Sequence, residues 1–302
     1  MIEERIKNFE QMGVGLFVHF GLYSNVGKGE WYMHDEKVSA QEYDKLMPIF
    51  KVKRCWAKGL VKLAKSLGAK YIVLTTRHHD GFSLYDTKGL TDYDVMHTPT
   101  KRDLIKDFTD ECRVNGISPF FYCTLIDWHN KDFEKDFDKY LDYLQKSITL
   151  LCTNYGKIGG FWFDGTWQNK NIDWKLDALY SIIRKHQPDA IISNNGGLEN
   201  CGEVINGEID CTIFERNVPL VANKSSKKYL AKEMCQILND HWGYCKKDNN
   251  YKSVKSLFAD YKTCRDNGAN FLLNVGPKGD GRIKHKDKTI IKKLGKMIKN
   301  SK

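Results

Sequence analysis

Eight short apolar segments recur along this chain of 302 residues, and amphipathic segments separate most of them. The apolar segments have the length and composition of β-strands, whereas the segments between them place apolar residues at helical spacing. Alternating strands and helices indicate a parallel sheet, and eight strands favour closure into a (β/α)₈ barrel of the TIM type. The predicted strands are Val14 to Phe20, Tyr71 to Thr75, Pro119 to Tyr122, Gly160 to Asp164, Ala190 to Ser193, Cys211 to Phe214, Met234 to Leu238 and Asn270 to Val275.

The predicted helices are Trp56 to Leu67, Leu104 to Val114, Tyr140 to Leu151, Leu176 to His186, Val254 to Cys264 and Lys286 to Lys299. Residues 21–52 and 194–210 lack a clean helical pattern and are predicted to be long loops, which lie over active sites more often than they serve as plain connectors. No composition shift marks a second domain. We therefore expect one somewhat irregular α/β barrel domain over residues 1–302.

The composition excludes several classes of partner. Hydrophobic residues make up 41% of the chain, enough to bury a large core. The formal net charge of +10 comes mostly from lysines spread along the chain, without an arginine-rich arm, so we expect no nucleic acid partner. No apolar stretch reaches the roughly 18 residues of a transmembrane helix, so we expect no membrane partner.

The cysteines and the first residues of the chain indicate the cellular compartment of the protein. Nine scattered cysteines, without a Cys-x-x-Cys pair, fit a reducing compartment better than a disulfide framework. The start, Met1 to Arg5, is charged and has no apolar segment of a secretory leader. These features predict a cytoplasmic protein.

The segment Phe161 to Gly165 is the strongest functional signal in the chain. Its apolar run ends in one carboxylate, Asp164, and Gly165 then allows the backbone to turn. Because side chains alternate along a strand, Trp162 and Asp164 share one face and Phe161 and Phe163 share the other. A carboxylate at the carboxyl end of a buried strand, with an indole beside it, suits chemistry at the mouth of a parallel barrel. Alone, Asp164 could equally cap the next helix or close a turn.

Polar side chains recur at the other strand ends, where a barrel carries its chemistry. They are His19, Arg77 to Asp80, Tyr122, Asp127 to His129, Glu215, Arg216 and Glu233, and several tryptophans lie nearby. Tryptophan faces stack on the C–H surfaces of sugars, while carboxylates, histidines and arginines hydrogen-bond the hydroxyls, so the set is typical of a small-ligand pocket. A metal site built from His78, His79 and Asp80 is a weaker alternative, because no His-x-His or His-Glu-x-x-His spacing supports it.

Glycosidic cleavage needs two carboxyl groups. One is ionised and attacks the anomeric carbon, and the other is protonated and donates its proton to the leaving oxygen. Asp164 is the better candidate for the nucleophile because it ends a rigid strand among polar neighbours. Glu233 is the candidate acid, provided that burial or Asp164 raises its pKa. Chemistry alone leaves the acid open among Glu233, Glu30, Glu199, Glu203, Glu208 and Glu215.

The motifs together resemble the α-L-fucosidases of glycoside hydrolase family 29. The matching stretches occur in family order and cover nearly the whole chain. They are Gly15 to Gly21, Gly29 to Tyr32, Thr76 to Phe82, Phe121-Tyr122, Trp162 to Gly165, Glu233 to Cys235, Trp242 to Tyr244 and Asn270 to Pro277.

The resemblance implies a barrel fold and a retaining, exo-acting α-L-fucosidase that removes terminal fucose through a covalent intermediate. It implies Asp164 as the nucleophile and Glu233 as the acid/base, with no metal and no cofactor. The residues implied to hold the fucosyl unit are His19, Glu30, Trp31, His78, His79, Tyr122, Trp162 and Arg216. A fucose-binding module without turnover is the main alternative, and homo-oligomerisation is left open.

Three features depart from the family pattern. Lys232 stands where many relatives have tryptophan, and Asp127 stands where a glutamate is common. The chain ends near the end of the barrel, so we expect no C-terminal β-sandwich. The fucosyl linkage therefore stays open.

Overall fold

The strands of the computed structural model form a closed parallel barrel, in the order β1 to β8 with β1 paired to β8. The structure describes residues 2–168, 172–219 and 228–301. The strands are β1 (Val14–Val18), β2 (Tyr71–Arg77), β3 (Ser118–Thr124), β4 (Gly160–Asp164), β5 (Ile191–Asn194), β6 (Cys211–Glu215), β7 (Ala231–Gln236) and β8 (Ala269–Val275). The predicted (β/α)₈ fold is confirmed, and every predicted strand overlaps one of these.

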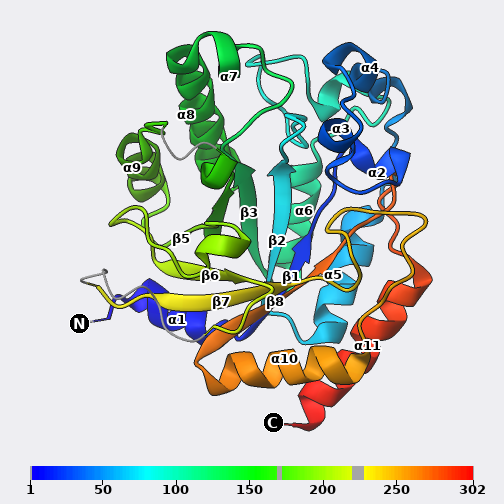
Figure 1. The fold of residues 1–302 in the computed structure, drawn as a ribbon, viewed down its shortest axis with the longest axis vertical. Coiled ribbons are helices and arrows are strands. Elements are labelled where there is room, and N and C mark those ends of the chain that lie inside the picture. Colours follow the sequence, from blue (N-terminus) through cyan, green and yellow to red (C-terminus); the bar gives the residue numbers. More distant parts are fainter. Residues whose placement is uncertain (1, 169–171, 220–227, 302) are drawn as a thin grey trace.

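Long helices surround the barrel (Figure 1). They are α5 (Trp56–Leu67), α6 (Leu104–Val114), α8 (Phe137–Asn154), α9 (Leu176–His186), α10 (Val254–Asp266) and α11 (His285–Asn300). Each of the six overlaps a predicted helix, because apolar residues at helical spacing give each one a face that packs on the sheet.

Some elements differ from the prediction. Helix α1 (Glu4–Met12) was not predicted, and residues 21–52 contain α2 (Tyr23–Val26), α3 (Tyr32–Asp35) and α4 (Ala40–Asp44) rather than a plain loop. A further short helix, α7 (Asp132–Lys135), follows β3. These helices are too short for periodicity to reveal them, except α1, whose first residues were read as a charged chain start.

The register of β7 corrects the prediction that matters most for function. The strand begins at Ala231, not at Met234, because Ala231 pairs with Cys211 and Glu233 pairs with Ile213 of β6. Glu233 therefore lies in the middle of the strand rather than before it. Glu215 pairs with Cys235 and lies one layer nearer the carboxyl ends of the strands.

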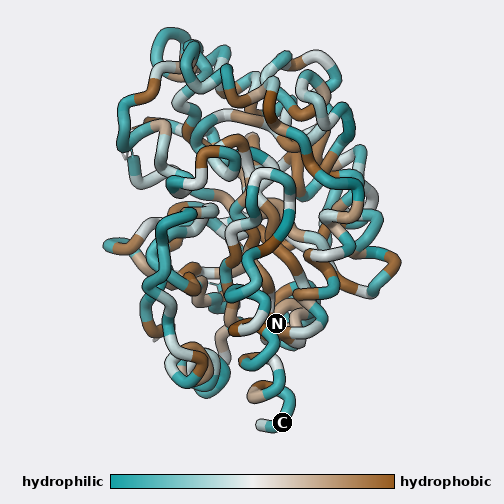
Figure 2. The backbone as a smooth tube through the Cα atoms, turned by 90° about the vertical axis from the view of Figure 1, so that its right-hand side faces the viewer, coloured by the Kyte–Doolittle hydropathy of each residue, from teal (hydrophilic) through white to brown (hydrophobic). Residues whose placement is uncertain are grey.

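Two apolar cores share the barrel wall. The outer core joins the strands to the helices and includes Phe161 and Phe163. The inner core fills the barrel and includes Trp162 and Tyr71, with Ile6 and Phe9 of α1 packed against its lower end. The prediction that Trp162 faces away from its two phenylalanine neighbours is thus confirmed. In Figure 2 the hydrophobic stretches gather in the interior of the molecule, while much of the periphery is hydrophilic.

None of the helices in the described part of the chain is long and apolar enough to cross a lipid bilayer. All nine cysteines are free thiols, and six of them are buried. Buried thiols of this kind act as small apolar fillers.

Gly15 on β1 is required by the packing inside the barrel. A Cβ atom there would lie 2.4 Å from Cζ of Tyr71 and 2.8 Å from Cδ1 of Leu272. Gly15→Ala is expected to lower the free energy of unfolding by about 1–3 kcal/mol through overpacking, measured by urea denaturation. Gly59→Ala on α5 is the control, because a Cβ atom added there would have no atom of another element within 4 Å. It should raise stability by roughly 0.5–1 kcal/mol, and an equal loss in both variants would contradict the packing argument.

Candidate active site

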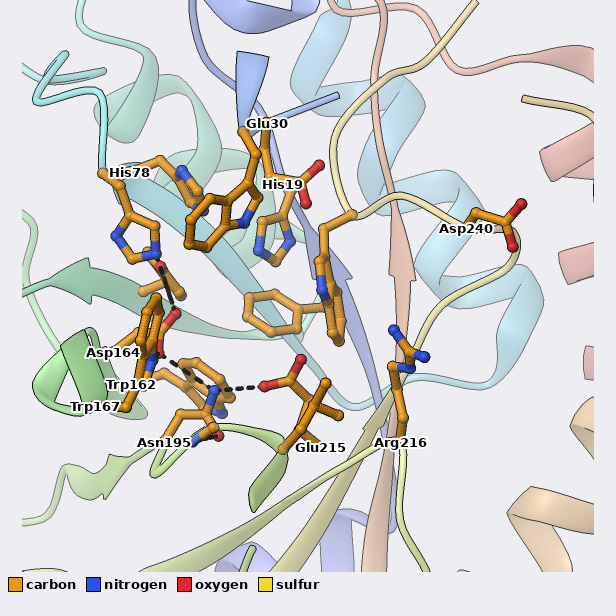
Figure 3. A pocket seen from close by; sticks show the side chains of 17 residues that line it. His19, Glu30, His78, Trp162, Asp164, Trp167, Asn195, Glu215, Arg216 and Asp240 are labelled. Atoms are coloured by element: carbon orange, nitrogen blue, oxygen red, sulfur yellow. Dashed lines mark hydrogen bonds and ion pairs between the residues drawn. The ribbon is translucent and has the colours of Figure 1, made fainter. Parts of the chain in front are cut away.

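A cavity of about 390 Å³ opens at the carboxyl ends of the strands. Asp164 and all eight residues predicted to hold the substrate line it. The described lining residues are Phe17, His19, Glu30, Trp31, His78, His79, Tyr122, Trp162, Asp164, Trp167, Asn195, Gly197, Leu198, Glu215, Arg216, Asp240 and Trp242 (Figure 3). The side chains come from loops and strand ends that are far apart in sequence, so the barrel itself assembles the site.

Asp164 ends β4 and is held by four hydrogen-bond donors. Its Oδ1 accepts from the backbone N–H of Gly165 at 2.9 Å, from Trp167 Nε1 at 2.8 Å and from Asn195 Nδ2 at 3.3 Å. Its Oδ2 accepts from the Tyr122 hydroxyl at 2.8 Å. Burial raises the pKa of Asp164, and the bonds from Trp167 and Tyr122 oppose that rise by favouring the carboxylate.

Gly165 makes this arrangement possible. Its φ of +103° lies in a region that residues with a side chain rarely adopt. The chain turns sharply there and enters the short 3₁₀ helix Thr166–Gln168, which brings the indole of Trp167 back to the carboxylate. The glycine that the sequence analysis read as a turn residue thus supplies one of the donors to Asp164.

Glu215 ends β6, and its carboxyl group is tied to Asp164 through one amide. Asn195 Nδ2 donates to Glu215 Oε2 at 2.8 Å and also reaches Asp164 Oδ1, as the dashed lines in Figure 3 show. Burial, and after it the negative charge of Asp164, raise the pKa of Glu215 to about 7. A carboxyl group with such a pKa is protonated in roughly half of the molecules at pH 7, so it can both give and take a proton.

The imidazoles of His19 and His79 present unprotonated nitrogens. Asn274 donates its Nδ2 to the Trp242 carbonyl, so its Oδ1 accepts from His19 Nδ1 at 2.8 Å. Thr124 donates its hydroxyl to the Ile126 carbonyl, so Oγ1 accepts from His79 Nδ1 at 2.7 Å. Burial lowers the pKa of each histidine to about 3. Both rings are therefore neutral. Nε2 of His19 is left to accept a hydrogen bond from a hydroxyl group, whereas Nε2 of His79 lies 3.6 Å from Oδ2 of Asp164.

His78 and Glu30 complete the polar lining. Burial holds the pKa of His78 well below its usual range, and its ring stacks on Tyr122 at 5.5 Å and 15°. Glu30 Oε2 accepts from the backbone N–H of Gly243 at 2.7 Å, and burial raises its pKa. These groups offer both hydrogen-bond donors and acceptors to a ligand with several hydroxyls.

Aromatic rings form one wall of the cavity. Trp31 stacks on Trp167 at 5.8 Å and 27°, and it packs against Trp128 at 5.1 Å. The indole of Trp242 lies 5.2 Å from the His19 ring. Such faces suit the apolar C–H surface of a sugar ring. Arg216 and Asp240 lie on the far side of the cavity from Asp164 (Figure 3).

Two residues that were predicted to take part in the chemistry, Glu233 and Asp80, do not line the cavity. Glu233 is absent from the described lining of the cavity, and its carboxyl group lies inside the barrel, bonded to Tyr71 and to Trp162. Asp80, which the metal alternative needs beside the histidines, accepts instead from the Tyr43 hydroxyl at 2.8 Å. No group of three or more potential metal ligands occurs among the described residues.

Asn195 and Trp167 were not predicted to be site residues, and Glu215 was one of several candidate acids behind Glu233. Asn195 directly follows β5, so the rule that strand ends carry the chemistry could have found it. Asn195 matters because its side chain contacts two carboxyl groups, and no sequence pattern predicts such a contact. The structure also adds Phe17, Gly197 and Leu198 to the lining.

A closed (β/α)₈ barrel that gathers two linked carboxyl groups and an aromatic wall at its strand ends has the construction of a glycoside hydrolase. Comparison with known proteins identifies the family. The family model described as alpha-L-fucosidase matches residues 3–302. The chain therefore belongs to the α-L-fucosidase family.

Solved structures of α-L-fucosidases are similar throughout the chain. Isoenzyme 1 from Paenibacillus thiaminolyticus matches with a TM-score of 0.89 and 34% identity, over 98% of this chain and 75% of that one. AlfC from Lactobacillus casei, in complex with its α-L-fucose product, matches with a TM-score of 0.87 and 26% identity, over 99% of both chains.

Curated relatives are more distant and longer. The α-L-fucosidase of Dictyostelium discoideum is 24% identical over 310 residues, which cover 91% of this chain and 66% of the relative. The tissue α-L-fucosidase of Homo sapiens is 24% identical over 303 residues, which cover 91% of this chain and 63% of the relative. The chain thus spans slightly less than two thirds of the length of these relatives.

The link between the two carboxyl groups can be tested by titration. Asp164→Asn removes a negative charge beside Glu215, so the pKa of Glu215 should fall below about 7. Carboxyl-labelled glutamate and ¹³C NMR would measure it, with Glu215→Gln identifying the signal. An unchanged pKa would show that the charge of Asp164 does not act on Glu215.

Proposed function

We propose that this chain is a retaining, exo-acting α-L-fucosidase that hydrolyses terminal α-L-fucosidic bonds in oligosaccharides or glycoconjugates. Membership of the family supports the reaction, and the pocket has the mixed polar and aromatic lining that a deoxyhexose needs. The observation that carries the proposal is the Asn195 side chain, which reaches the carboxyl groups of Asp164 and Glu215 from one nitrogen atom.

The spacing of the two carboxyl groups supports retention of configuration. One nitrogen lies 3.3 Å from an oxygen of Asp164 and 2.8 Å from an oxygen of Glu215. Those oxygens are therefore at most about 6 Å apart, compared with roughly 5–5.5 Å between carboxyl groups in retaining enzymes and about 6.5–9.5 Å in inverting ones. The gap suits direct attack by a carboxylate better than the entry of a water molecule between the groups.

The reaction follows from the environments of the two groups. In the first step an oxygen of Asp164 bonds to the anomeric carbon while Glu215 gives its proton to the departing glycosidic oxygen. In the second step Glu215 takes a proton from water, and the water oxygen replaces Asp164 on the anomeric carbon. The donors on Asp164, chiefly Trp167 and Tyr122, favour its ionised form in the free enzyme and stabilise it as it leaves.

Glu215 is better placed for the proton transfers than Glu233, which the family resemblance suggested. Glu215 lines the cavity, whereas both oxygens of Glu233 are bonded inside the barrel. Burial raises the pKa of both groups to about 7, so their pKa values do not distinguish them. Access to the glycosidic oxygen decides the role, because a general acid must come within hydrogen-bond reach of it.

The remaining lining residues are proposed to recognise fucose. The Nε2 atom of His19 accepts a hydrogen bond from one of its hydroxyls, and Glu30 and His78 hydrogen-bond the same sugar. His79 lies beside Asp164, 3.6 Å from its Oδ2, and contacts the sugar next to the nucleophile. The indoles of Trp31 and Trp162 contact the apolar surface of the sugar. Arg216 follows the acid in the sequence and lines the same cavity.

Removing the nucleophile should abolish turnover. Asp164→Asn is expected to lower kcat at least roughly 10³-fold on an aryl α-L-fucoside, because the covalent step needs the carboxylate. A chromogenic fucoside assay measures the loss. Fucose affinity, measured by calorimetry, should change much less, and this contrast separates turnover from binding. Wild-type protein that binds fucose without turnover would instead support the lectin-like alternative.

Removing the acid should affect substrates according to their leaving groups. Glu215→Ala is expected to lower kcat/KM roughly 10²–10⁴-fold on natural fucosides, less on activated aryl fucosides, and azide should restore part of the aryl activity. In the wild type, kcat/KM should fall as pH rises through about 7, because Glu215 must be protonated. It should also fall at low pH, where Asp164 takes up a proton. Glu215→Gln should lack the fall near pH 7; if it keeps that fall, another group is the acid.

A further inference from the structure

Glu233 is a buried carboxyl group that the reaction does not use. It is the third residue of β7, points into the barrel, and only 1% of its surface is exposed. Its Oε1 accepts from Trp162 Nε1 at 2.9 Å, and its Oε2 accepts from the Tyr71 hydroxyl. A carboxyl group in an apolar interior is costly, so its partners must offset a large desolvation term.

The Trp162 indole links this carboxyl group to the cavity. Its ring lines the cavity, and its Nε1 points down to Glu233. The ring stacks on Tyr122 at 5.5 Å and 21° and meets the edge of Phe17 at 5.0 Å. Tyr122 in turn donates its hydroxyl to Asp164. The tilt of the indole therefore affects both the floor of the cavity and the tyrosine that holds the nucleophile.

Glu233 is the acceptor that the indole N–H uses, and most of the described side chains around it are apolar. The inner core around Trp162 is made of apolar and aromatic side chains, among them Ile191, Ile213 and Leu272. A buried donor without an acceptor costs about 1–3 kcal/mol. If Glu233 lost its acceptor oxygen, the ring would lose this bond and would have to turn toward another acceptor, such as the Ser193 hydroxyl on the neighbouring strand, or leave its N–H unpaired.

We propose that Glu233 is a positioning residue that fixes the Trp162 indole as the floor of the fucose-binding cavity. The Tyr71 hydroxyl on β2 donates to the other carboxyl oxygen and offsets part of the cost of burying it. The proposal rests on the function proposed above, and it assigns Glu233 no proton transfer.

Three variants separate this role from that of an acid. Glu233→Gln can keep both contacts, because its Oε1 can accept from Trp162 and its Nε2 can donate to the Tyr71 oxygen. Its kcat and KM should stay within about threefold of wild type. Glu233→Leu has a similar size and no acceptor, so KM for fucosides should rise roughly tenfold, equally for aryl and natural substrates, with a smaller change in kcat.

Tyr71→Phe is the matched control. It removes the other hydrogen bond of Glu233 and leaves the bond to Trp162, so it should destabilise the fold without raising KM more than about twofold. A KM for Glu233→Leu like that of Tyr71→Phe would overturn the proposal. A kcat for Glu233→Gln that falls roughly 10²–10⁴-fold, most with poor leaving groups, would make Glu233 the acid instead.

Two further measurements guard against ambiguous outcomes. Fucose affinity by calorimetry tests the cavity floor even if the wild type does not hydrolyse fucosides, so failure of the proposed function and failure of this proposal are distinguishable. If Glu233→Leu does not fold, the ¹H–¹⁵N signal of the Trp162 indole decides. It should shift in Glu233→Gln, where the acceptor changes from carboxyl to amide, and shift less in Tyr71→Phe; no shift in Glu233→Gln would overturn the proposal.

Discussion

The closure of eight parallel strands into one hydrogen-bonded ring is the constraint on which the rest of the structure depends. Pairing of β1 with β8 leaves the strands no free edge and fixes the register around the barrel. Because side chains alternate along each strand, that register decides which residues enter the barrel and at what depth. Asp164 and Glu215 each end a strand and reach the mouth, whereas Glu233 lies a layer below.

Hydrogen bonds stabilise the acidic side chains that are buried in the barrel, away from water. The buried carboxyl group of Asp164 accepts four hydrogen bonds and that of Glu233 accepts two. Neither is neutralised by an adjacent lysine or arginine among the described residues, so burial raises the pKa of both. The larger number of donors to Asp164 favours its ionised form, as the nucleophilic role proposed for it requires. The two bonds of Glu233 fit the positioning role proposed for that residue.

Much of the fold and of the site was predictable, for local reasons. The apolar runs and helical spacings predicted every barrel strand and six long helices, because burial against a sheet imposes those periods. The strand-end rule led to Asp164 and His19, and family motifs added Glu30 and Trp31, all of which line the cavity. Asn195 was missed because its contact with two carboxyl groups arises only in the tertiary structure. The choice between Glu233 and Glu215 depends on the depth of each residue in the barrel.

The sequence by itself determined the class of fold, the family and the chemistry available at the strand ends, because periodicity and motif order are written along the chain. Only the tertiary structure decided which two carboxyl groups share one amide, and that the carboxyl group of Glu233 lies inside the barrel, bonded to Trp162 and Tyr71. The physical reason is the strand register. A shift of two residues along β7 or β6 moves a side chain by one layer, from the barrel interior to its mouth, and register is set by pairing between strands rather than by residues within one.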